Sequence, residues 1–477
     1  MKSLWSDTVE FKTQKPLSRD MEADVIIIGA GLAGLLTAYF LQNAGKTVII
    51  LERDRVSGGV TEYTSAKITS QHGIIYSRLI KEFGSDKARL YAKANESAIK
   101  KYSEIIAEHS IDCDFEKKRA FVYTLGDTAK VKDEAEAAKS LGIDAYYTED
   151  LNLPFKAAGA VCFNNQAQFN PLKFLAPISE TLTIFENCLV RNVEDNKIIA
   201  GDFTVKGKDV VIATHYPIIN APGYYFARMH QSRSYFIAVT GARDLGGMYL
   251  ADDSQYSFRN YNEYLLIGGS GHRTGENKSG GAYGFLTKSA REWFSDCSVK
   301  YNWSAQDCMP ADGVPYIGRY SASTPNMYVA TGFQKWGMTS SMAAASILCD
   351  MITGRKSEFE ELFTPQRFNV TASVKQLATD TAEAVSGLFK TAFTPPDSAL
   401  SEIKPGHGGI VEYNERKIGV YKSPENIVYT VDVKCPHLGC QLDWNPDDLT
   451  WECPCHGSRF DYQGKLLNSP ATRDAGI

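Results

Sequence analysis

Cysteine and histidine residues gather in two short boxes near the C-terminus, and this feature restricts the possible folds most strongly. The boxes read KCPHLGC and CPCHGS, and they hold four of the ten cysteines and two of the eight histidines within 22 residues. Cys435 and His437 form one pair of potential metal ligands, and Cys453 and His456 form another. Zinc ribbons and fingers usually pair like ligands, as in Cys-x2-Cys. Because each box mixes a thiolate with an imidazole, the pattern favours a binuclear iron centre with thiolates on one iron and imidazoles on the other; a zinc site or a metal-free fold is the alternative.

These boxes resemble those of Rieske [2Fe–2S] domains, and the resemblance covers about residues 406–477. It implies a small all-β domain in which a disulfide between Cys440 and Cys455 ties the two ligand loops together. The cluster ligands that it implies are Cys435, His437, Cys453 and His456.

Two positions near the second box bear on the reduction potential of such a cluster. Ser458 keeps the hydroxyl that hydrogen-bonds the cluster in high-potential Rieske domains, whereas Phe460 stands where those domains have a tyrosine. Loss of one hydrogen-bond donor should lower the potential of the cluster. We therefore expect an intermediate potential, within the roughly −150 to +300 mV range of Rieske centres but below its upper end.

A second constraint lies in the N-terminal segment VIIIGAGLAGLLTAYFLQNAGKTVIILE, which begins at Val25. Two apolar β-branched runs flank a glycine-rich turn and a helical pattern, and Glu52 ends the second run. This order is the fingerprint of a dinucleotide-binding fold. Gly29 permits the tight turn, Gly31 lets backbone amides approach a pyrophosphate, and Gly34 lets the helix pack close to the strand. Glu52 can accept hydrogen bonds from ribose hydroxyls, but the fingerprint alone does not distinguish FAD from NAD.

Later segments favour FAD. A stretch rich in glycine and hydroxyl residues follows Glu52, an apolar strand ends at Thr214, and a strand, a glycine-bounded loop and an apolar helix come later. If that helix begins near Met338, the positive end of its dipole can face a flavin ring on which negative charge develops during reduction. These segments, in this order, resemble the D-amino-acid oxidase/glycine oxidase superfamily of FAD-dependent oxidoreductases over about residues 23–355.

This second resemblance implies an α/β, Rossmann-like FAD-binding domain with an interleaved α+β substrate domain. After an N-terminal extension of residues 1–22, we expect the FAD-binding part at about 23–110, 176–218 and 306–355, and the substrate part at about 111–175 and 219–305. The FAD contacts that the resemblance implies are Gly29, Gly31, Gly34, Glu52, Arg53, Thr61, Thr64, Ser65, Val190, Thr214, Gly332, Lys335, Trp336, Gly337, Met338 and Thr339.

Residues 356–405 are expected to connect the two domains. Apolar residues from Val374 to Ala392 recur at helical spacing, and Pro395 and Pro396 end the pattern. The charges within this helix cancel, so it has no basic face for lipid headgroups, and an interdomain brace is the favoured interpretation.

A further glycine-rich stretch contains Gly269, Gly271 and Gly275. Its glycine spacing is one residue too long for a second dinucleotide turn, and no apolar helix follows it. We therefore interpret this stretch as a turn of the substrate domain rather than an NAD(P)H site.

Composition excludes several classes of partner. A formal net charge of −5 gives no basic surface for nucleic acid or anionic lipid. The N-terminus lacks the apolar region of a signal peptide, and the apolar run of residues 25–41 belongs to the nucleotide site, so we expect no transmembrane segment. The cysteines outside the C-terminal boxes are scattered, which is typical of a cytoplasmic protein.

Flavins remove two electrons together as a hydride, whereas a Rieske cluster passes one electron at a time. We therefore expect an enzyme, an FAD-dependent dehydrogenase that passes electrons through a [2Fe–2S] cluster to an external one-electron carrier. The small-molecule amine or amino-acid-like substrate follows from the family resemblance alone. Two alternatives stay open: electrons could flow from a reduced carrier through the cluster to flavin for substrate reduction, or the protein could be a redox-sensing regulator.

Hydride transfer depends more on orientation than on an acid–base pair, so no catalytic triad is required. The candidate catalytic residues are Lys67, His72 and Trp336. Arg233 or Arg259 could pair with a substrate carboxylate, and His215 could also face the substrate, with structural roles as the alternative for each.

Overall fold

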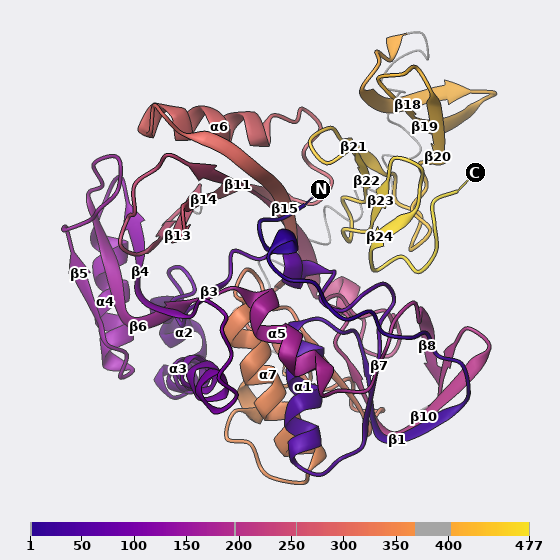
Figure 1. The fold of residues 1–477 in the computed structure, drawn as a ribbon, viewed down its shortest axis with the longest axis horizontal. Coiled ribbons are helices and arrows are strands. Elements are labelled where there is room, and N and C mark those ends of the chain that lie inside the picture. The colour runs from indigo at the N-terminus through magenta and orange to yellow at the C-terminus, as the bar shows by residue number, and fades with distance from the viewer. Residues whose placement is uncertain (1, 195–196, 254, 368–401, 477) are drawn as a thin grey trace.

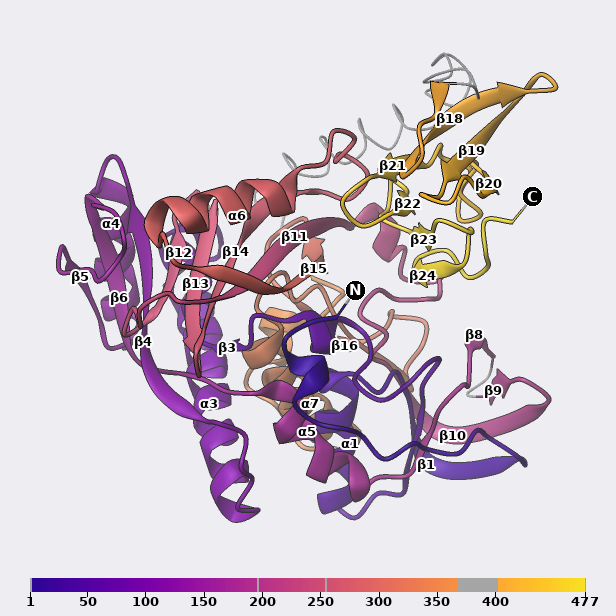
Figure 2. The ribbon, with the colours of Figure 1, turned by 45° about the horizontal axis from the view of Figure 1, so that its top comes forward.

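The computed structural model describes residues 2–194, 197–253, 255–367 and 402–476. Its N-terminal part, residues 2–367, contains two large sheets, and its C-terminal part, residues 402–476, contains small antiparallel sheets (Figures 1 and 2). The amphipathic helix expected between Val374 and Ala392 lies outside the described residues. Among the residues that are described, no helix is both long enough and apolar enough to cross a membrane.

A mainly parallel sheet carries the glycine-rich turn. Its strand β1 (Met21–Ile28) pairs in parallel with β2 (Val48–Leu51) and β10 (Phe203–Ile212), and β10 pairs in parallel with β17 (Met327–Thr331). These strands are apolar and buried toward their carboxyl ends, as expected for a parallel sheet covered on both faces. The sheet is completed by β16 (Tyr316–Arg319), β7 (Ile184–Phe185), β8 (Val190–Glu194) and β9 (Lys197–Ala200).

Two helices start at the carboxyl edge of this parallel sheet. Helix α1 (Leu32–Asn43) follows β1, and α7 (Gly337–Ile352) follows β17. The two helices pack against each other (Figure 1). Because both follow parallel strands, their N-terminal amides come to the same edge of the sheet, where doubly wound proteins bind their ligands.

The other large sheet is mainly antiparallel. Its order is β15 (Ser298–Pro310), β11 (Met229–Thr240), β14 (Tyr264–Arg273), β13 (Tyr256–Tyr261), β12 (Met248–Ala251), β4 (Glu116–Thr124), β6 (Gly159–Gln168) and β3 (Lys67–Ile68), with β5 (Ala145–Thr148) beside β6. The chain enters the two large sheets alternately, which confirms the interleaved architecture. Gly269 and Gly271 lie within antiparallel strand β14, so this segment does not form a second strand–turn–helix nucleotide site.

Helices cover both large sheets. Helix α6 (Ala282–Trp293) packs across β11 and β14 (Figure 2), and α4 (Ala129–Ser140) packs on β5 and β6. The remaining helices of the described residues are α2 (Tyr76–Phe83), α3 (Ser85–Glu108), α5 (Pro171–Glu180), α8 (Glu360–Phe363), and the 3-10 turns η1 (Trp5–Asp7), η2 (Val60–Tyr63) and η3 (Tyr225–Ala227).

The C-terminal part is built from antiparallel strands, which confirms the all-β fold expected for it. One sheet consists of β18 (His407–Tyr413), β19 (Arg416–Lys422) and β20 (Val428–Asp432). The other consists of β21 (Asp443–Asn445), β22 (Thr450–Glu452), β23 (Arg459–Asp461) and β24 (Leu466–Asn468). Figure 1 shows this part, in yellow and orange, next to the ends of β11 and β15.

A buried group of four charges joins the two parts. Arg233 on β11 pairs with Asp448 and lies 3.9 Å from Glu452. Arg459 pairs with Asp448 at 3.2 Å and with Glu452 at 3.0 Å. No side chain of the four is more than 9% exposed. Burial favours the neutral acids, but the two arginines outweigh it and hold the pKa values of Asp448 and Glu452 below their usual range.

We predict that Arg233→Met lowers the free energy of unfolding by about 3–5 kcal/mol, because it leaves two buried carboxylates with one cation. Urea denaturation followed by tryptophan fluorescence measures this change. The control is Lys278→Met, which removes an interdomain pair with Asp443 whose lysine is 53% exposed, and it should cost less than about 1 kcal/mol. Equal losses in the two variants would contradict the prediction.

Candidate functional site

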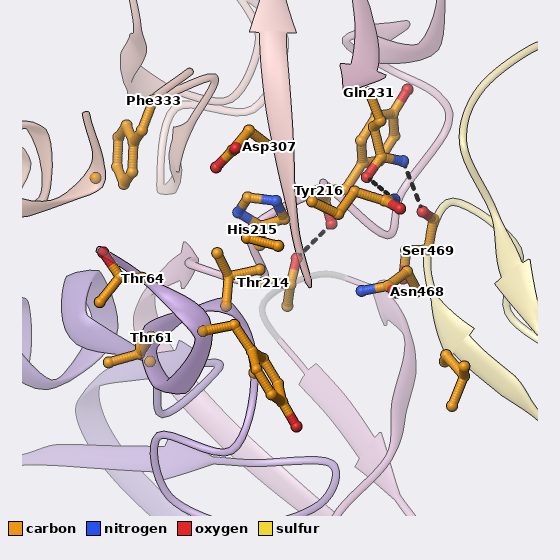
Figure 3. A pocket seen from close by; sticks show the side chains of 18 of the residues that line it. Thr61, Thr64, Thr214, His215, Tyr216, Gln231, Asp307, Phe333, Asn468 and Ser469 are labelled. Atoms are coloured by element: carbon orange, nitrogen blue, oxygen red, sulfur yellow. Dashed lines mark hydrogen bonds between the residues drawn. The ribbon is translucent and has the colours of Figure 1, made fainter. Parts of the chain in front are cut away.

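A cavity of about 740 Å³ lies between the carboxyl edge of the parallel sheet, the antiparallel sheet and the C-terminal part. Its volume is typical of a site for a small molecule or a cofactor. Gly29 and Gly31 lie at one wall, Phe236 and Gly268 belong to the antiparallel sheet, and Ser469 comes from the C-terminal part. Figure 3 shows part of the lining, with Thr61 and Thr64 on one side of the view, Asn468 and Ser469 on the other, and Thr214 and His215 between them.

Most of the residues predicted to contact FAD line this one cavity. Gly34 instead lies beneath the turn, where a Cβ would clash with the carbonyl oxygen of Gly29. Thr339 points away and donates a hydrogen bond to the Thr69 carbonyl at 3.1 Å, and Gly332 is also absent from the lining. The predicted residues that line the cavity are Gly29, Gly31, Glu52, Arg53, Thr61, Thr64, Ser65, Val190, Thr214, Lys335, Trp336, Gly337 and Met338.

The glycine-rich turn is shaped to hold a dinucleotide. Gly29 has φ +106°, and a Cβ there would lie 2.6 Å from the Ala213 carbonyl oxygen. Gly31 is the N-cap of α1 and provides no capping side chain. The Leu32 amide donates to Thr61 Oγ1 at 3.0 Å, and the next amides of the first turn can face a phosphate. At the end of β2, Glu52 accepts a hydrogen bond from the Ala30 amide at 2.8 Å, and burial raises its pKa. These features fit FAD, with Glu52 beside the position of a ribose.

Two of the three candidate catalytic residues face the cavity. The Lys67 ammonium group donates hydrogen bonds to the Tyr249 carbonyl at 2.9 Å and to Ser257 Oγ at 2.6 Å. Burial, assisted by nearby Arg259, lowers the pKa of Lys67 to about 7. Lys67 can therefore change its protonation state near neutral pH. Trp336 also lines the cavity.

His72, the third candidate, does not reach the cavity lining. Its ring stacks on Trp336, with centroids 4.8 Å apart, and hydrogen-bonds Tyr91 Oη at 2.6 Å and the Thr69 carbonyl at 2.9 Å. Burial lowers the pKa of His72 to about 3, so the ring is neutral at ordinary pH. His72 can position Trp336 from behind the cavity wall.

The arginines suggested for a substrate carboxylate have other partners. Arg233 neutralises Asp448. Arg259 Nη1 donates to the main-chain carbonyls of Ser65, Ala66 and Phe169, at 2.9, 2.7 and 3.2 Å. These partners favour the structural alternative for both arginines, and of the two Arg233 also lines the cavity.

Asp307, an acidic residue on the cavity wall, was not predicted from the sequence. It lies on β15 beside Phe333 and His215 in Figure 3. Burial raises the pKa of Asp307 to about 6, although Lys335 and Arg233 act in the opposite direction. An aspartate inside a long strand is unusual and was the available signal. Its orientation toward the cavity depends on the twist of β15, which the sequence does not reveal.

The two C-terminal boxes come together in space. The His437 and His456 rings lie 5.0 Å apart, and the Cys435 and Cys453 thiols are in hydrogen-bonding contact. Buried His437 Nδ1 has no hydrogen-bond partner among the described residues, so it is available as a ligand. Two thiolates and two imidazoles, held in facing loops, fit a Rieske [2Fe–2S] cluster.

The ligand loops are also tied to each other and to their surroundings. Cys440 and Cys455 form the disulfide that the resemblance implies. Ser458 Oγ accepts a hydrogen bond from the Ala471 amide at 3.0 Å and contacts the Cys435 thiol. The other ring nitrogen of His437 lies 3.1 Å from Asn220 Oδ1, in the N-terminal part of the chain. Such outer contacts orient metal ligands.

Comparison with known proteins agrees with this geometry. The family model described as FAD dependent oxidoreductase matches residues 24–351. The chain belongs to this family. A model of the Rieske [2Fe-2S] domain matches residues 395–475 of this oxidoreductase. A Bacillus subtilis (strain 168) protein named as a Rieske 2Fe-2S iron-sulfur protein, YhfW, is 35% identical over 487 residues, covering 98% of this chain and 96% of its own length.

Other similar proteins match a smaller share of the chain. The oxidoreductase OrdL of Haemophilus influenzae is 25% identical, over 76% of this chain and 91% of its own length. The structure of glycine oxidase from Geobacillus kaustophilus superposes with a TM-score of 0.62 at 16% identity, covering 73% of this chain and 99% of that one. L-amino acid deaminase from Proteus vulgaris gives a TM-score of 0.62 at 15% identity, covering 76% and 100%. These structures share the fold.

The family and the site geometry confirm the predicted class and cofactors. This protein is an enzyme, an FAD-dependent oxidoreductase of the amino-acid oxidase type with a C-terminal Rieske [2Fe–2S] domain. The individual contacts to FAD and to iron remain predictions that rest on the cavity and the ligand loops.

We predict that Phe460→Tyr raises the reduction potential of the cluster, because a hydroxyl near the sulfur ligands stabilises the reduced, more negative form. Phe460 is fully buried and pairs with Trp451 across β22 and β23, close to the ligand loops. Protein-film voltammetry on the two proteins measures the difference. Ser458→Ala, which removes a hydroxyl, should shift the potential downward; an unchanged or lower potential in Phe460→Tyr would count against the prediction.

Proposed function

We propose that this oxidoreductase dehydrogenates an amine or amino-acid-like substrate and passes the electrons through its Rieske cluster to an external one-electron acceptor. The observation that carries the proposal is the position of the Rieske ligand loop directly behind the wall of the FAD cavity. Gln231, which lines that cavity, donates a hydrogen bond to the main-chain carbonyl of His456 at 2.8 Å. When bound, FAD accepts two electrons as a hydride and the cluster transfers single electrons, so the pair converts two-electron into one-electron chemistry.

The charges of the cavity support a nitrogen-containing substrate. Asp307 can hold a substrate ammonium group, because its carboxylate lines the cavity. Lys335 also lines the cavity and can face a carboxylate where the substrate has one. The similar structures named glycine oxidase and L-amino acid deaminase support the same substrate class by analogy.

The residues around the substrate can also prepare it for oxidation. A C–H bond next to nitrogen gives up a hydride more readily once the nitrogen has lost its proton and can form an imine. Lys67 is suited to accept that proton, because its pKa of about 7 leaves much of it as a neutral amine at neutral pH. Phe236, stacked on Trp303 with centroids 5.6 Å apart, gives this wall an apolar, water-excluding surface.

Anaerobic titration of the purified enzyme tests the substrate class. We expect D-amino acids or N-methyl amines to bleach the flavin absorbance, with partial reduction of the cluster visible by electron paramagnetic resonance. Asp307→Asn should weaken the response to the same amine about 10- to 100-fold, which corresponds to ~1.5–3 kcal/mol for a hydrogen bond to a charged group. Exposed Asp202→Asn serves as the control.

Other outcomes of this titration would overturn the proposal. Bleaching by NAD(P)H but by no amine would show that the enzyme receives its electrons from a nicotinamide donor. Inertness toward the whole panel would favour substrate reduction or redox sensing.

The pH dependence tests the role of Lys67. Because the pKa of Lys67 is lowered to about 7, its neutral form increases as pH rises through this value. The rate of flavin bleaching by an active amine should therefore rise between about pH 6 and 8 and then level off. In Lys67→Met the rate should fall by about 10²–10⁴-fold and lose this rise, whereas exposed Lys139→Met should leave both unchanged. A rise through pH 7 that persists in Lys67→Met would assign the titration to another group.

A further inference from the structure

Two buried glutamines connect the wall of the FAD cavity with the Rieske ligand loop. Gln306 on β15 and Gln231 on β11 are 2% and 1% exposed, and both line the cavity. Gln306 Nε2 donates to the Gly457 carbonyl at 2.8 Å and to Gln231 Oε1 at 2.5 Å. Gln231 Nε2 donates to the carbonyls of His456 at 2.8 Å and Ser469 at 2.9 Å (Figure 3).

The cavity end of this connection is also built from hydrogen bonds. The main chain of Gln306 hydrogen-bonds the ring of His215, which lies on the cavity wall. His215 has φ +64°, a conformation that is uncommon for a residue with a side chain and that often marks a functional position. His215 Nε2 and Gln306 Oε1 are buried and have no hydrogen-bond partner among the described residues. A continuous series of contacts thus leads from the cavity through Gln306 to the residues next to the cluster.

The Rieske loop approaches these glutamines unusually closely. A Cβ at Gly457 would lie 2.6 Å from Cβ of Gln231, so only glycine allows the contact. At this distance the carbonyls of His456 and Gly457 are shielded from water and require donors from the facing strands. A glutamine amide offers two N–H donors and one acceptor, which is what this double contact uses.

Further contacts hold the loop in place. Arg273 reaches the carbonyls of Pro454 and Cys455, each at 3.3 Å. The Gly275 amide donates to Glu452 Oε2 at 3.0 Å. The Phe226 ring lies 5.6 Å from both His437 and His456. Together with the buried charges described above, these contacts fix the ligand loop against β11 and β15.

We propose that Gln231 and Gln306 are positioning residues that couple FAD electronically to the Rieske cluster within one chain. The proposal rests on the electron flow proposed above. In each transfer one electron passes from reduced FAD to a ferric ion of the oxidised cluster, and no bond to either glutamine forms or breaks. The external acceptor reoxidises the cluster after each transfer, and two transfers return FAD to its oxidised state as its proton leaves to solvent. Hydrogen-bonded contacts support tunnelling better than a van der Waals gap of the same width.

Laser-flash photoreduction of the holoenzyme tests this coupling without a substrate. A photoexcited 5-deazariboflavin donor delivers single electrons, and the exchange between flavin and cluster is followed by their separate absorbance changes. Gln306→Met and Gln231→Met keep the length of the side chain but lose its amide. In both variants we expect electron exchange to be at least about tenfold slower than in the unaltered enzyme, because small displacements of reacting groups are known to reduce rates by this much or more. Lys278→Met, which removes an interdomain ion pair away from the cavity, should exchange electrons at the unaltered rate.

Measurements on the same samples separate coupling from general damage. Both reduction potentials, the electron paramagnetic resonance g-values of the cluster and the FAD content should be unchanged in the variants. Gln306→Glu, which keeps the shape but loses the donor to Gly457, provides a second variant should methionine impair folding, and it should also slow the exchange.

The possible outcomes distinguish this inference from the proposed function. Fast exchange in the unaltered enzyme and equally fast exchange in all glutamine variants would overturn the coupling role and leave the proposed function intact. A slower exchange that is fully explained by a shifted cluster potential would also overturn it. No exchange in the unaltered enzyme would overturn both the coupling and the proposed electron flow.

Discussion

The contact between the loop that carries Cys453 and His456 and strands β11 and β15 determines how the two parts of the protein fit together. This contact brings the main-chain carbonyl of His456, a predicted cluster ligand, within 2.8 Å of a side chain on the cavity wall. Burial of two arginines with two carboxylates at the same interface is costly in isolation, but here each charge has an opposite partner. Each buried charge needs an opposite charge beside it, and this requirement favours one arrangement of the N-terminal and C-terminal parts over other arrangements that would bury a similar apolar surface.

One end of the cavity has the features of a common dinucleotide site, and the other end has charged residues that such a site does not require. The glycine-rich turn, Glu52 and the start of α1 provide groups that any dinucleotide fold needs. The antiparallel sheet adds Lys67 and Asp307, whose pKa values of about 7 and about 6 are brought toward neutrality by burial. The two groups come from β3 and β15, strands at opposite ends of the order of this sheet. The curvature of the sheet therefore determines which charges a substrate meets.

Several functional roles differ from what residue type alone suggests. Arginine is the usual partner of a substrate carboxylate, yet Arg233 and Arg259 satisfy buried groups of the protein itself. His72 lies in a segment that approaches the flavin site, but it supports Trp336 from behind. Gln231 and Gln306 carry no charge and match no motif, yet they make the closest polar contacts between the cavity wall and the ligand loop.

The parts whose chemistry depends on short spacings can be predicted from the sequence alone. The glycine turn with Glu52 predicts a dinucleotide site, and the mixed Cys and His boxes predict an iron–sulfur centre, because a strand–turn–helix unit and a pair of ligand loops are local structures. Their geometry is set by residues close together in the chain. Which residues face the cavity, and how the two cofactor sites adjoin, depends on the tertiary structure. Gly457 contacts Gln231 and Gln306, residues more than a hundred positions away in the chain. Such contacts depend on sheet twist and domain packing, which leave no periodic signal in the sequence.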